Sequence, residues 1–430
     1  MLENKKKEHP QILFYFIGIF PVIDFVNGLF LSEGFNLPIG ILYRIVLFIV
    51  LFLLFINDYE LVTSNFGILL ILIIASYSLI LAAQTIYFDN SLSILFNDTS
   101  AVVKYLLWFL IALLFSRIAD RKMNHLYIGI DILFVIGLLV PYFLGLGNYT
   151  YTNSSAGYKS YFYATNDLTY IMVILCTFLL SIIIKCFSKK EWVYVSLLFS
   201  LYLLNCYCLL LIGTKIGIVY GIANLIVTIF YLLLFKTDVP YQIKFLILQL
   251  TFIGSIFVIF WGNTLFMKSI QGTVDRITYF YELYDGNWIK ILSSSRSIYF
   301  TDALTNFIMY PKNQWVFLLG FGVKNRWSFF GRAGGYIEVD FLDTFFSYGA
   351  VGFIFFCLPL IYLIYRIFKY HLFTREAFLL FFTLGYAATA GHVFYSAASA
   401  TILGLVVSRL LPIRKEEDFE YFNDRAQYEG

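Results

Sequence analysis

Twelve apolar runs of about 20 residues each determine what this chain can fold into. A helix of that length spans the roughly 30 Å hydrocarbon core of a bilayer. The runs are too long for the strands of a membrane β-barrel, and their residues do not alternate in polarity. Hydrophobic residues make up 60% of the chain and charged residues 13%, which is more apolar surface than a soluble domain could bury. We therefore predict an all-α, polytopic membrane protein of about 12 transmembrane helices with one large extracytoplasmic loop.

The positions of Lys and Arg orient these spans, because cytoplasmic loops carry an excess of both. With a cytoplasmic N-terminus, the inner segments hold most of the basic residues, including Lys5, Lys6 and Lys7, and the short outer loops hold only Lys159 and Lys215. We expect a multi-pass protein of the cytoplasmic membrane with both termini in the cytoplasm. The spans are expected at 11–31, 38–57, 66–86, 101–118, 125–146, 168–187, 192–211, 215–235, 243–262, 346–367, 376–390 and 392–411.

One segment between the spans is much longer than the others. It is rich in aromatic residues, with Trp288, Trp315 and Trp327 among them. That composition indicates an ordered, partly membrane-associated domain rather than a flexible linker. We find no internal repeat in the sequence. The chain thus divides into spans 1 to 9 (1–262), the large extracytoplasmic loop (263–345), spans 10 to 12 (346–411) and a cytoplasmic tail (412–430).

The sequence argues against several functional classes. The net charge of +3 is too small to indicate a nucleic-acid partner. There is no P-loop or GxGxxG stretch for a nucleotide. The five cysteines lie inside apolar runs without a CxxC pair, so we expect buried apolar side chains rather than metal ligands or disulfides. We predict neither a metal site nor a cofactor.

Polar residues interrupt the outer ends of the earlier spans. Asn166 and Asp167 open the sixth span, shortly after Lys159. Asn and Asp are also good helix-capping residues, which accounts for Asp167 equally well. Between spans 7 and 8, Gly213 permits a turn, whereas a turn does not require Lys215. Lys215 either reaches the phosphates of lipid headgroups or binds a specific anionic substrate.

An arginine stands where a helix is expected to begin in the long loop. Arg296 follows three serines, and Ile298, Leu304 and Ile308 continue at helical spacing. If the helix begins near Ser295, its N-terminal amides and Arg296 together favour an anion. The planar guanidinium suits phosphate because it bonds two oxygens at once.

Three acids, Glu338, Asp340 and Asp343, directly precede the tenth span. A helix macrodipole explains Asp343 well, but it explains three acids close to Arg326 less well. Clustered carboxylates beside cations suit acid–base chemistry on a sugar hydroxyl. His392, between the last two spans, is either a structural hydrogen-bonding group or a further catalytic candidate.

The substrate class follows from the expected location of these residues outside the membrane. We expect neither ATP nor a nucleotide sugar there, so a transfer reaction needs an activated substrate that arrives within the membrane. Glycans linked to lipid pyrophosphate meet this requirement. Their diphosphate suits Lys and Arg, and their sugars suit aromatic and acidic side chains. The expected partners are such a lipid-linked oligosaccharide and the bilayer.

The order and spacing of several short motifs resemble the O-antigen polymerase and ligase superfamily. The resemblance is to its Wzy-type polymerases in particular, which serve capsule and exopolysaccharide pathways of Gram-positive bacteria. It covers most of the chain. The motifs are IFPVIDFVNGLF (19–30), the Asn of FYATNDLTY (162–170), GTK (213–215), SR (295–296), LLGFG (318–322), EVDFLDTFFSYGAVG (338–352) and AGH (390–392).

The resemblance implies a membrane glycosyltransferase that inverts the anomeric centre without a metal ion. It would polymerise repeat units carried on undecaprenyl pyrophosphate, with a co-polymerase or chain-length regulator as a further partner. Arg296 would hold the pyrophosphate, and Lys215 stands where the family more often has the Arg of a GTR motif. Our candidates for the general base are, in order, Glu338, Asp340 and His392. The candidates for substrate binding are Arg296, Lys215, Lys159, Asn166, Asp343 and Gly213.

Two other functions stay open. A ligase would move the finished glycan to another acceptor, and ligase members resemble one another in a pattern HNxxLxxxxxxGxxG that enters a late span. Leu342, Gly349 and Gly352 fit this pattern, but Glu338 and Val339 replace its His and Asn, which argues against a ligase. A flippase for lipid-linked sugars would suit twelve spans, but many transporters consist of two similar halves, and none are visible here.

Overall fold

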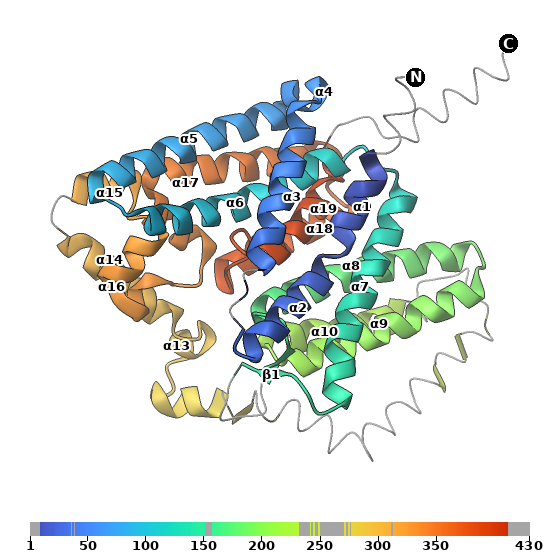
Figure 1. The fold of residues 1–430 in the computed structure, drawn as a ribbon. Coiled ribbons are helices and arrows are strands. Elements are labelled where there is room, and N and C mark those ends of the chain that lie inside the picture. The colour runs from blue at the N-terminus through green and yellow to red at the C-terminus, as the bar shows by residue number, and fades with distance from the viewer. Residues whose placement is uncertain are drawn as a thin grey trace, which may run out of the picture. The chain divides into compact units, whose positions relative to one another are not determined.

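The computed structural model describes residues 9–35, 39–150, 157–231, 277–310 and 313–411, with a few positions between them (37, 241, 244–245, 248–249, 271 and 274–275). Helices make up nearly all of the regular structure in this part of the chain (Figure 1). The chain forms two compact units. We call them unit 1 (Met1–Gly40 and Asp120–Tyr279) and unit 2 (Ile41–Ala119 and Phe280–Gly430) and describe each by itself.

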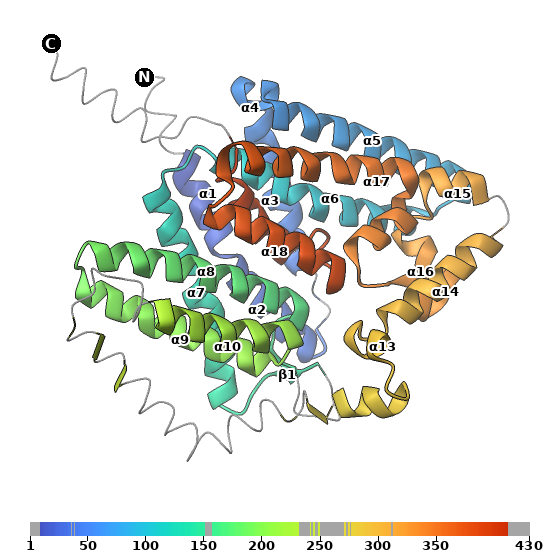
Figure 2. The ribbon, with the colours of Figure 1, turned by 180° about the vertical axis from the view of Figure 1, so that it is seen from behind.

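Unit 1 consists of helices and one short antiparallel hairpin, in which Asn148 pairs with Ser160. Its elements are α1 (His9–Gly18), α2 (Phe20–Ser32), α7 (Asp120–Phe143), β1 (Asn148–Tyr149), β2 (Tyr158–Ser160), α8 (Thr165–Ser188), α9 (Trp192–Ile212) and α10 (Lys215–Phe230). Helix α8 packs along α9, and both α7 and α10 contact this pair (Figure 2). Apolar side chains of α8 and α9, such as Leu179, Ile183 and Leu198, form a buried cluster.

Unit 2 contains the long helices α5, α6 and α17, which lie side by side in both views (Figures 1 and 2). Helix α19 packs along α6, and α14 packs on α16. The elements are α3 (Ile39–Ile56), α4 (Tyr59–Thr63), α5 (Asn65–Phe88), α6 (Leu92–Phe115), α13 (Trp288–Leu292), α14 (Arg296–Met309), α15 (Asn313–Leu319), α16 (Val323–Gly335), α17 (Asp340–Arg366), η3 (Ile367–His371), α18 (Arg375–Thr389) and α19 (Ala397–Val407).

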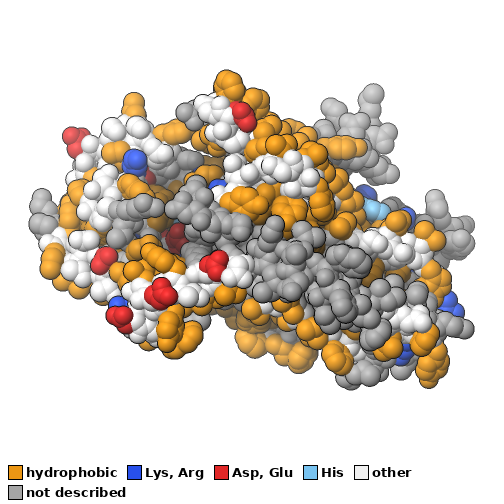
Figure 3. Space-filling model, turned by 90° about the horizontal axis from the view of Figure 1, so that it is seen from below, with side chains coloured by type: hydrophobic (Ala, Val, Ile, Leu, Met, Phe, Trp, Pro, Cys, Tyr) orange, Lys and Arg blue, Asp and Glu red, His pale blue; other side chains and the backbone are white. Residues whose placement is uncertain are grey.

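Seven described helices are long and apolar enough to cross a membrane, which confirms the prediction of an all-α, multi-pass membrane protein. Large hydrophobic side chains such as Ile68, Leu79 and Ile136 are exposed on them, as helices facing lipid require. Hydrophobic side chains also cover much of the described surface in Figure 3, where charged side chains are few. The seven are Ile39–Ile56, Asn65–Phe88, Leu92–Phe115, Asp120–Phe143, Thr165–Phe187, Trp192–Ile212 and Asp340–His371.

Several predicted spans differ from the observed helices: the span predicted at 101–118, for example, is α6, which begins nine residues earlier at Leu92. The span predicted at 11–31 is interrupted at Ile19, between α1 and α2. Pro21 lies in the first turn of α2, where its missing N–H costs no helical hydrogen bond, but it cannot continue α1. The span predicted at 346–367 begins six residues earlier, at Asp340, because acidic residues favour the first turn of a helix.

The last two predicted spans, 376–390 and 392–411, correspond to α18 and to the shorter α19. In the long loop, the described residues form helices α13 to α16. Its helix expected near Ser295 is α14, for which Ser295 is the N-cap residue. Most of the predicted span 243–262 and all of the tail 412–430 lie outside the described residues.

Two glycines let the segment before α16 cross α17 at very short range. Gly320 and Gly349 both have φ near +70°, where only glycine is unstrained. A Cβ on Gly349 would collide with the carbonyl group of Leu318, and a Cβ on Gly320 would collide with the carbonyl of Ser347. The backbone of α17 is non-helical at Gly349, so α17 has two halves. The motifs LLGFG and FSYGAVG are therefore halves of one backbone crossing.

Gln84 of α5 donates a hydrogen bond to each of the two segments that cross. It is buried, and its Nε2 donates to the carbonyl oxygens of Leu319 (2.6 Å) and Ser347 (2.8 Å). The N–H of Gly322 donates to the same Ser347 oxygen (2.8 Å). These bonds fix the first half of α17, which carries the acids, against the loop helices.

Candidate functional site

Three segments of unit 2 meet around Arg296, the first residue of α14. Its Nη2 pairs with Oε2 of Glu338 at 2.8 Å, and its Nε donates to the backbone oxygen of Glu338 at 3.1 Å. Nη2 also lies 3.4 Å from the carbonyl oxygen of Ala390. One guanidinium thus joins the start of α14, the loop before α17 and the end of α18. The structure brings the first cationic candidate and the first candidate base into direct contact.

The carboxyl group of Glu338 is partly exposed at a surface. Its side chain is 44% exposed, whereas that of Arg296 is 14% exposed. Arg296 is the only partner of the Glu338 carboxylate among the described residues, and it uses Oε2. Oε1 is therefore available to a ligand. A half-exposed carboxylate with one available oxygen can accept a proton from a bound hydroxyl.

Asp340 has a different environment. It is fully buried, and its carboxylate accepts three backbone N–H bonds from the loop between α18 and α19. Oδ1 accepts from His392 (2.6 Å), and Oδ2 accepts from Val393 (2.8 Å) and Phe394 (3.2 Å). Asp340 holds the position of this loop, and its oxygens face backbone amides.

Asp343 is also buried and bonded within the protein. It forms an ion pair with Arg326, which is itself buried, and it accepts from the N–H groups of Ile337 (3.0 Å) and Val339 (3.2 Å). These two amides flank Glu338. Asp343 and Arg326 therefore shape the turn that carries Glu338.

Left-handed backbone conformations concentrate at this site. Eight described non-glycine residues have positive φ, and four of them, Ser294, Ser295, Glu338 and His392, belong to the three segments that meet here. Such conformations cost of order 1–3 kcal/mol each and persist only where the surroundings enforce them. Gly391 shares the conformation, and a Cβ on it would collide with the carbonyl oxygen of Glu338. The site is a set of strained turns held by hydrogen bonds.

Aromatic side chains line the same region. The ring of Tyr336 packs edge-on against the His392 ring, with centroids 5.8 Å apart, and Trp327 packs on Tyr336 at 5.6 Å. The guanidinium of Arg326 lies over the Tyr336 ring, 5.6 Å from its centroid. Partly exposed aromatic rings beside a carboxylate are suited to holding a sugar.

The remaining candidates lie in unit 1, at one end of its helices. Gly213 (φ 67°) ends α9, and Lys215 is the first residue of α10. The hydroxyl of Thr214 bonds that of Thr169 (2.7 Å) in the first turns of α8, whose second residue is Asn166. The turn carrying Lys215 and the turn carrying Asn166 are thereby joined.

Lys159 lies in β2, which contacts α8 and α9. Its Nζ donates to the carbonyl oxygen of Tyr163 at 3.0 Å. Burial lowers the pKa of the Lys159 ammonium below its usual range. Cations at this end of unit 1 can attract an anion, and the charge of Lys159 depends on pH more than that of an exposed lysine.

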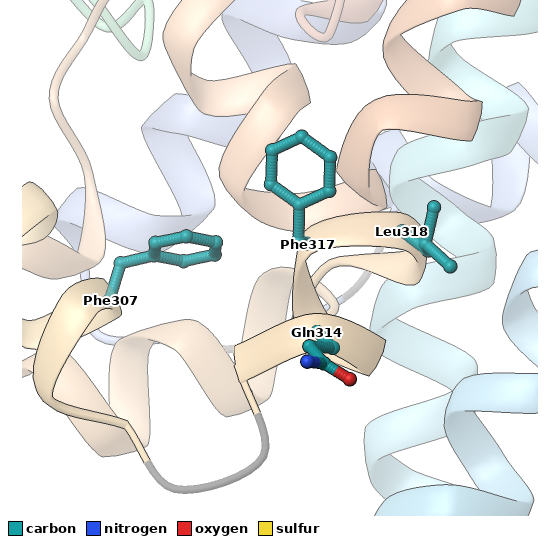
Figure 4. Close-up of a pocket in the computed structure, with 4 residues that line it drawn as sticks. All are labelled: Phe307, Gln314, Phe317 and Leu318. Atoms are coloured by element: carbon teal, nitrogen blue, oxygen red, sulfur yellow. The ribbon is translucent and has the colours of Figure 1, made fainter.

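A separate apolar pocket of 420 Å³ lies in unit 2, lined by Phe307 of α14 and by Gln314, Phe317 and Leu318 of α15 (Figure 4). Phe307 is eleven residues after Arg296 on the same helix, which corresponds to about 16 Å along its axis. The pocket is therefore distinct from the contacts around Arg296.

Sequence reasoning missed several residues that build the site. Gln84 and the backbone of 393–394 belong to no motif. Gly391 and residue 392 belong to the motif AGH, but the motif does not show which residues they contact. The partners of all these residues are more than 50 residues away in the chain. In the part of the chain that the structure describes, no group of three His, Cys, Asp or Glu side chains is arranged to hold a metal ion.

Residues 6–285 match the model of the family described as O-antigen ligase like membrane protein. The matched range includes Lys159, Asn166, Gly213 and Lys215 and ends before Arg296. No curated protein matches the chain. The match covers more than half of a multi-pass helical protein, and the chain therefore belongs to the O-antigen ligase-like membrane protein family, whose members transfer glycosyl groups at membranes.

Proposed function

We propose that this protein polymerises oligosaccharide repeat units carried on undecaprenyl pyrophosphate, at the outer face of the cytoplasmic membrane. The pair formed by Arg296 and Glu338 carries this proposal. It combines a cation that can bind a diphosphate with a carboxylate that keeps one oxygen available for an acceptor hydroxyl. Membership of a family of membrane glycosyl-transfer enzymes supports it.

The reaction is a single displacement at the anomeric carbon, which inverts that centre. Glu338 takes the proton of the acceptor hydroxyl while the hydroxyl oxygen forms the new glycosidic bond. The bond between the anomeric carbon and the pyrophosphate oxygen breaks, and the pyrophosphate leaves with the bonding electrons. Arg296 stabilises the negative charge that grows on this leaving group. No metal ion is needed, since the guanidinium supplies the positive charge.

Because Arg296 and Glu338 are in contact, binding of the donor to Arg296 also affects Glu338. A bound pyrophosphate competes with Glu338 for the guanidinium of Arg296, which can make two parallel bonds to phosphate oxygens. Donor binding thus weakens the pair and frees Oε2 of Glu338 for the acceptor hydroxyl.

Asp340, Asp343 and Arg326 have supporting roles in this mechanism. Their hydrogen bonds fix the loop of His392 and the turn of Glu338. His392 lies beside Tyr336 at the edge of the site, where it contacts the sugar. In unit 1, Lys159 and Lys215 attract the anionic donor.

The second candidate function is a ligase that transfers the finished glycan to a different acceptor. The matched family is described as O-antigen ligase like, which favours this function. The same two residues would serve this reaction, because only the acceptor differs. The two functions are distinguished by the glycans that accumulate when the protein is absent.

The test is deletion of the gene in its host, followed by complementation with variants and electrophoresis of lipid-linked and surface glycans. A polymerase deletion reduces the surface ladder to a single repeat unit. Full-length chains stranded on the lipid carrier would instead identify a ligase, and repeat units trapped on the cytoplasmic leaflet would refute glycosyl transfer as the function.

Complementation assigns the residues. Glu338→Gln and Arg296→Ala should reach the membrane at wild-type levels but fail to restore the ladder, since a general base contributes about 10²–10⁴-fold to the rate. Glu60→Gln is a matched control, because Glu60 pairs with Arg117 at the same 2.8 Å in unit 2. It should restore the ladder fully. A normal ladder from Glu338→Gln removes Glu338 from the mechanism.

A further inference from the structure

A carboxyl group lies in the middle of a membrane-spanning helix of unit 1, outside the site described above. Asp131 is the twelfth of the 24 residues of α7, about 16 Å from the start of that helix. It is fully buried, and so is its partner Asn205 of α9. The Nδ2 of Asn205 donates to Oδ1 of Asp131 at 2.5 Å. Ionisable residues at this depth are rare and costly.

Two acceptor atoms of this pair lack a donor. In the described part of the chain, neither Oδ2 of Asp131 nor Oδ1 of Asn205 has a hydrogen-bond partner, although both atoms are buried. Asp131 has no ion pair with a described residue either. A buried acceptor without a donor costs about 1–3 kcal/mol, and an unpaired ionised carboxylate costs more.

Among the residues that the structure describes, no charged group near Asp131 compensates an ionised carboxylate. The titratable groups that face it are the thiols of Cys176 on α8 and Cys208 on α9, and both cysteines are buried. None of the described titratable residues of α1, α2 or β2, which also contact α7, interacts with it. Cys176 in turn lies 3.8 Å from the sulfur of Cys206 and accepts from Asn224 at 3.2 Å.

A proton on Asp131 removes the problem of both acceptor atoms that lack a donor. The protonated Oδ2 becomes a donor, and Oδ1 of Asn205 is the unused acceptor on the same partner. A carboxylic acid and a carboxamide then share two hydrogen bonds, and the pair carries no net charge. A metal cation fits less well, because hard cations take six or more oxygen ligands and the titratable groups that face Asp131 are thiols.

We propose that Asp131 and Asn205 form an intramembrane proton-binding site, in which a neutral carboxyl group joins α7 to α9 through two hydrogen bonds with the carboxamide. The site has a structural consequence. Helix α9 ends at Ile212, seven residues after Asn205, and the turn with Gly213 and Lys215 follows. The bound proton therefore fixes the helix that carries this turn.

The test uses the full-length protein in detergent at neutral pH. The infrared difference spectrum between wild type and Asp131→Asn should contain the carbonyl stretch of one protonated carboxyl group. Asp131→Asn should melt close to the wild type, because two carboxamides form the same pair of bonds. Asp131→Ala and Asn205→Ala should melt clearly lower. The wild type should lose stability relative to Asp131→Asn as pH rises, since its unfolding releases the proton.

Three outcomes would overturn the proposal. One is a difference spectrum without a protonated-carboxyl band. Another is a melting temperature of Asp131→Asn as low as that of Asp131→Ala. The third is stabilisation of the wild type, but not of Asp131→Asn, by sodium ions, which would identify a metal cation as the ligand.

Discussion

Replacing Asp340 by Asn tests whether this carboxylate holds the His392 loop or acts as a base. The three N–H groups that it accepts lie at 2.6, 2.8 and 3.2 Å. Asparagine keeps one acceptor oxygen and turns a donor NH₂ toward at least one of these amides. A buried donor left without an acceptor costs about 1–3 kcal/mol. Asp340→Ala removes all three bonds, and because bonds to one carboxylate are not additive, we expect a loss on the order of 4 kcal/mol.

The assay is thermal unfolding in detergent, combined with glycan transfer measured well below the unfolding temperature. We expect the midpoint to fall by a few degrees for Asp340→Asn and further for Asp340→Ala. Transfer by Asp340→Asn should be reduced but not abolished, because Glu338 and Arg296 are still present. An unchanged midpoint for Asp340→Ala, or complete loss of transfer by a stable Asp340→Asn, would refute the anchoring role.

Three further substitutions test other contacts. Gly349→Ala should abolish folding, because the added Cβ would collide with the carbonyl of Leu318 and residue 349 has a left-handed φ. Gly385→Ala is the control and should stabilise α18 by about 0.5–1 kcal/mol. The measurement is the yield of folded protein, and equal yields for the two variants would contradict the close backbone contact at Gly349. Gln84→Leu should lower the unfolding midpoint, since the carbonyl of Leu319 loses the Gln84 donor and the carbonyl of Ser347 keeps only the N–H of Gly322. An unchanged midpoint would mean that the Gln84 bonds contribute nothing. Burial lowers the pKa of Lys159, so this lysine should lose its charge at a lower pH than an exposed lysine. As pH rises, donor binding should therefore weaken earlier in the wild type than in Lys159→Arg, whose guanidinium stays charged. Identical pH profiles of donor binding would exclude Lys159 from binding the donor.

Hydropathy was enough to predict the membrane fold. A long apolar run in lipid forms a helix, because its backbone N–H and C=O groups must make their hydrogen bonds within the segment. The start of α14 was also predictable, since serines before helical spacing are a local signal. By contrast, the breaks at Ile19 and Gly349 are invisible to hydropathy, because an apolar run gives the same average whether or not its helix continues.

The roles of the acids could not be separated by sequence. Glu338, Asp340 and Asp343 lie within six residues, and a turn with left-handed φ at Glu338 sends them to different environments. One is exposed beside an arginine, and two are buried among backbone amides. The distant partners of the acids come from residues 296, 326 and 392–394, and only the tertiary fold brings these segments to the acids.

The most direct test of the central claim uses purified protein and a synthetic repeat unit on undecaprenyl pyrophosphate. The products are separated by size on a gel. The account predicts a ladder of polymer with the wild type and with Glu60→Gln, and no product with Glu338→Gln or Arg296→Ala. A ladder formed by Glu338→Gln at the wild-type rate, or a wild-type protein that leaves the repeat unit unchanged, would contradict it.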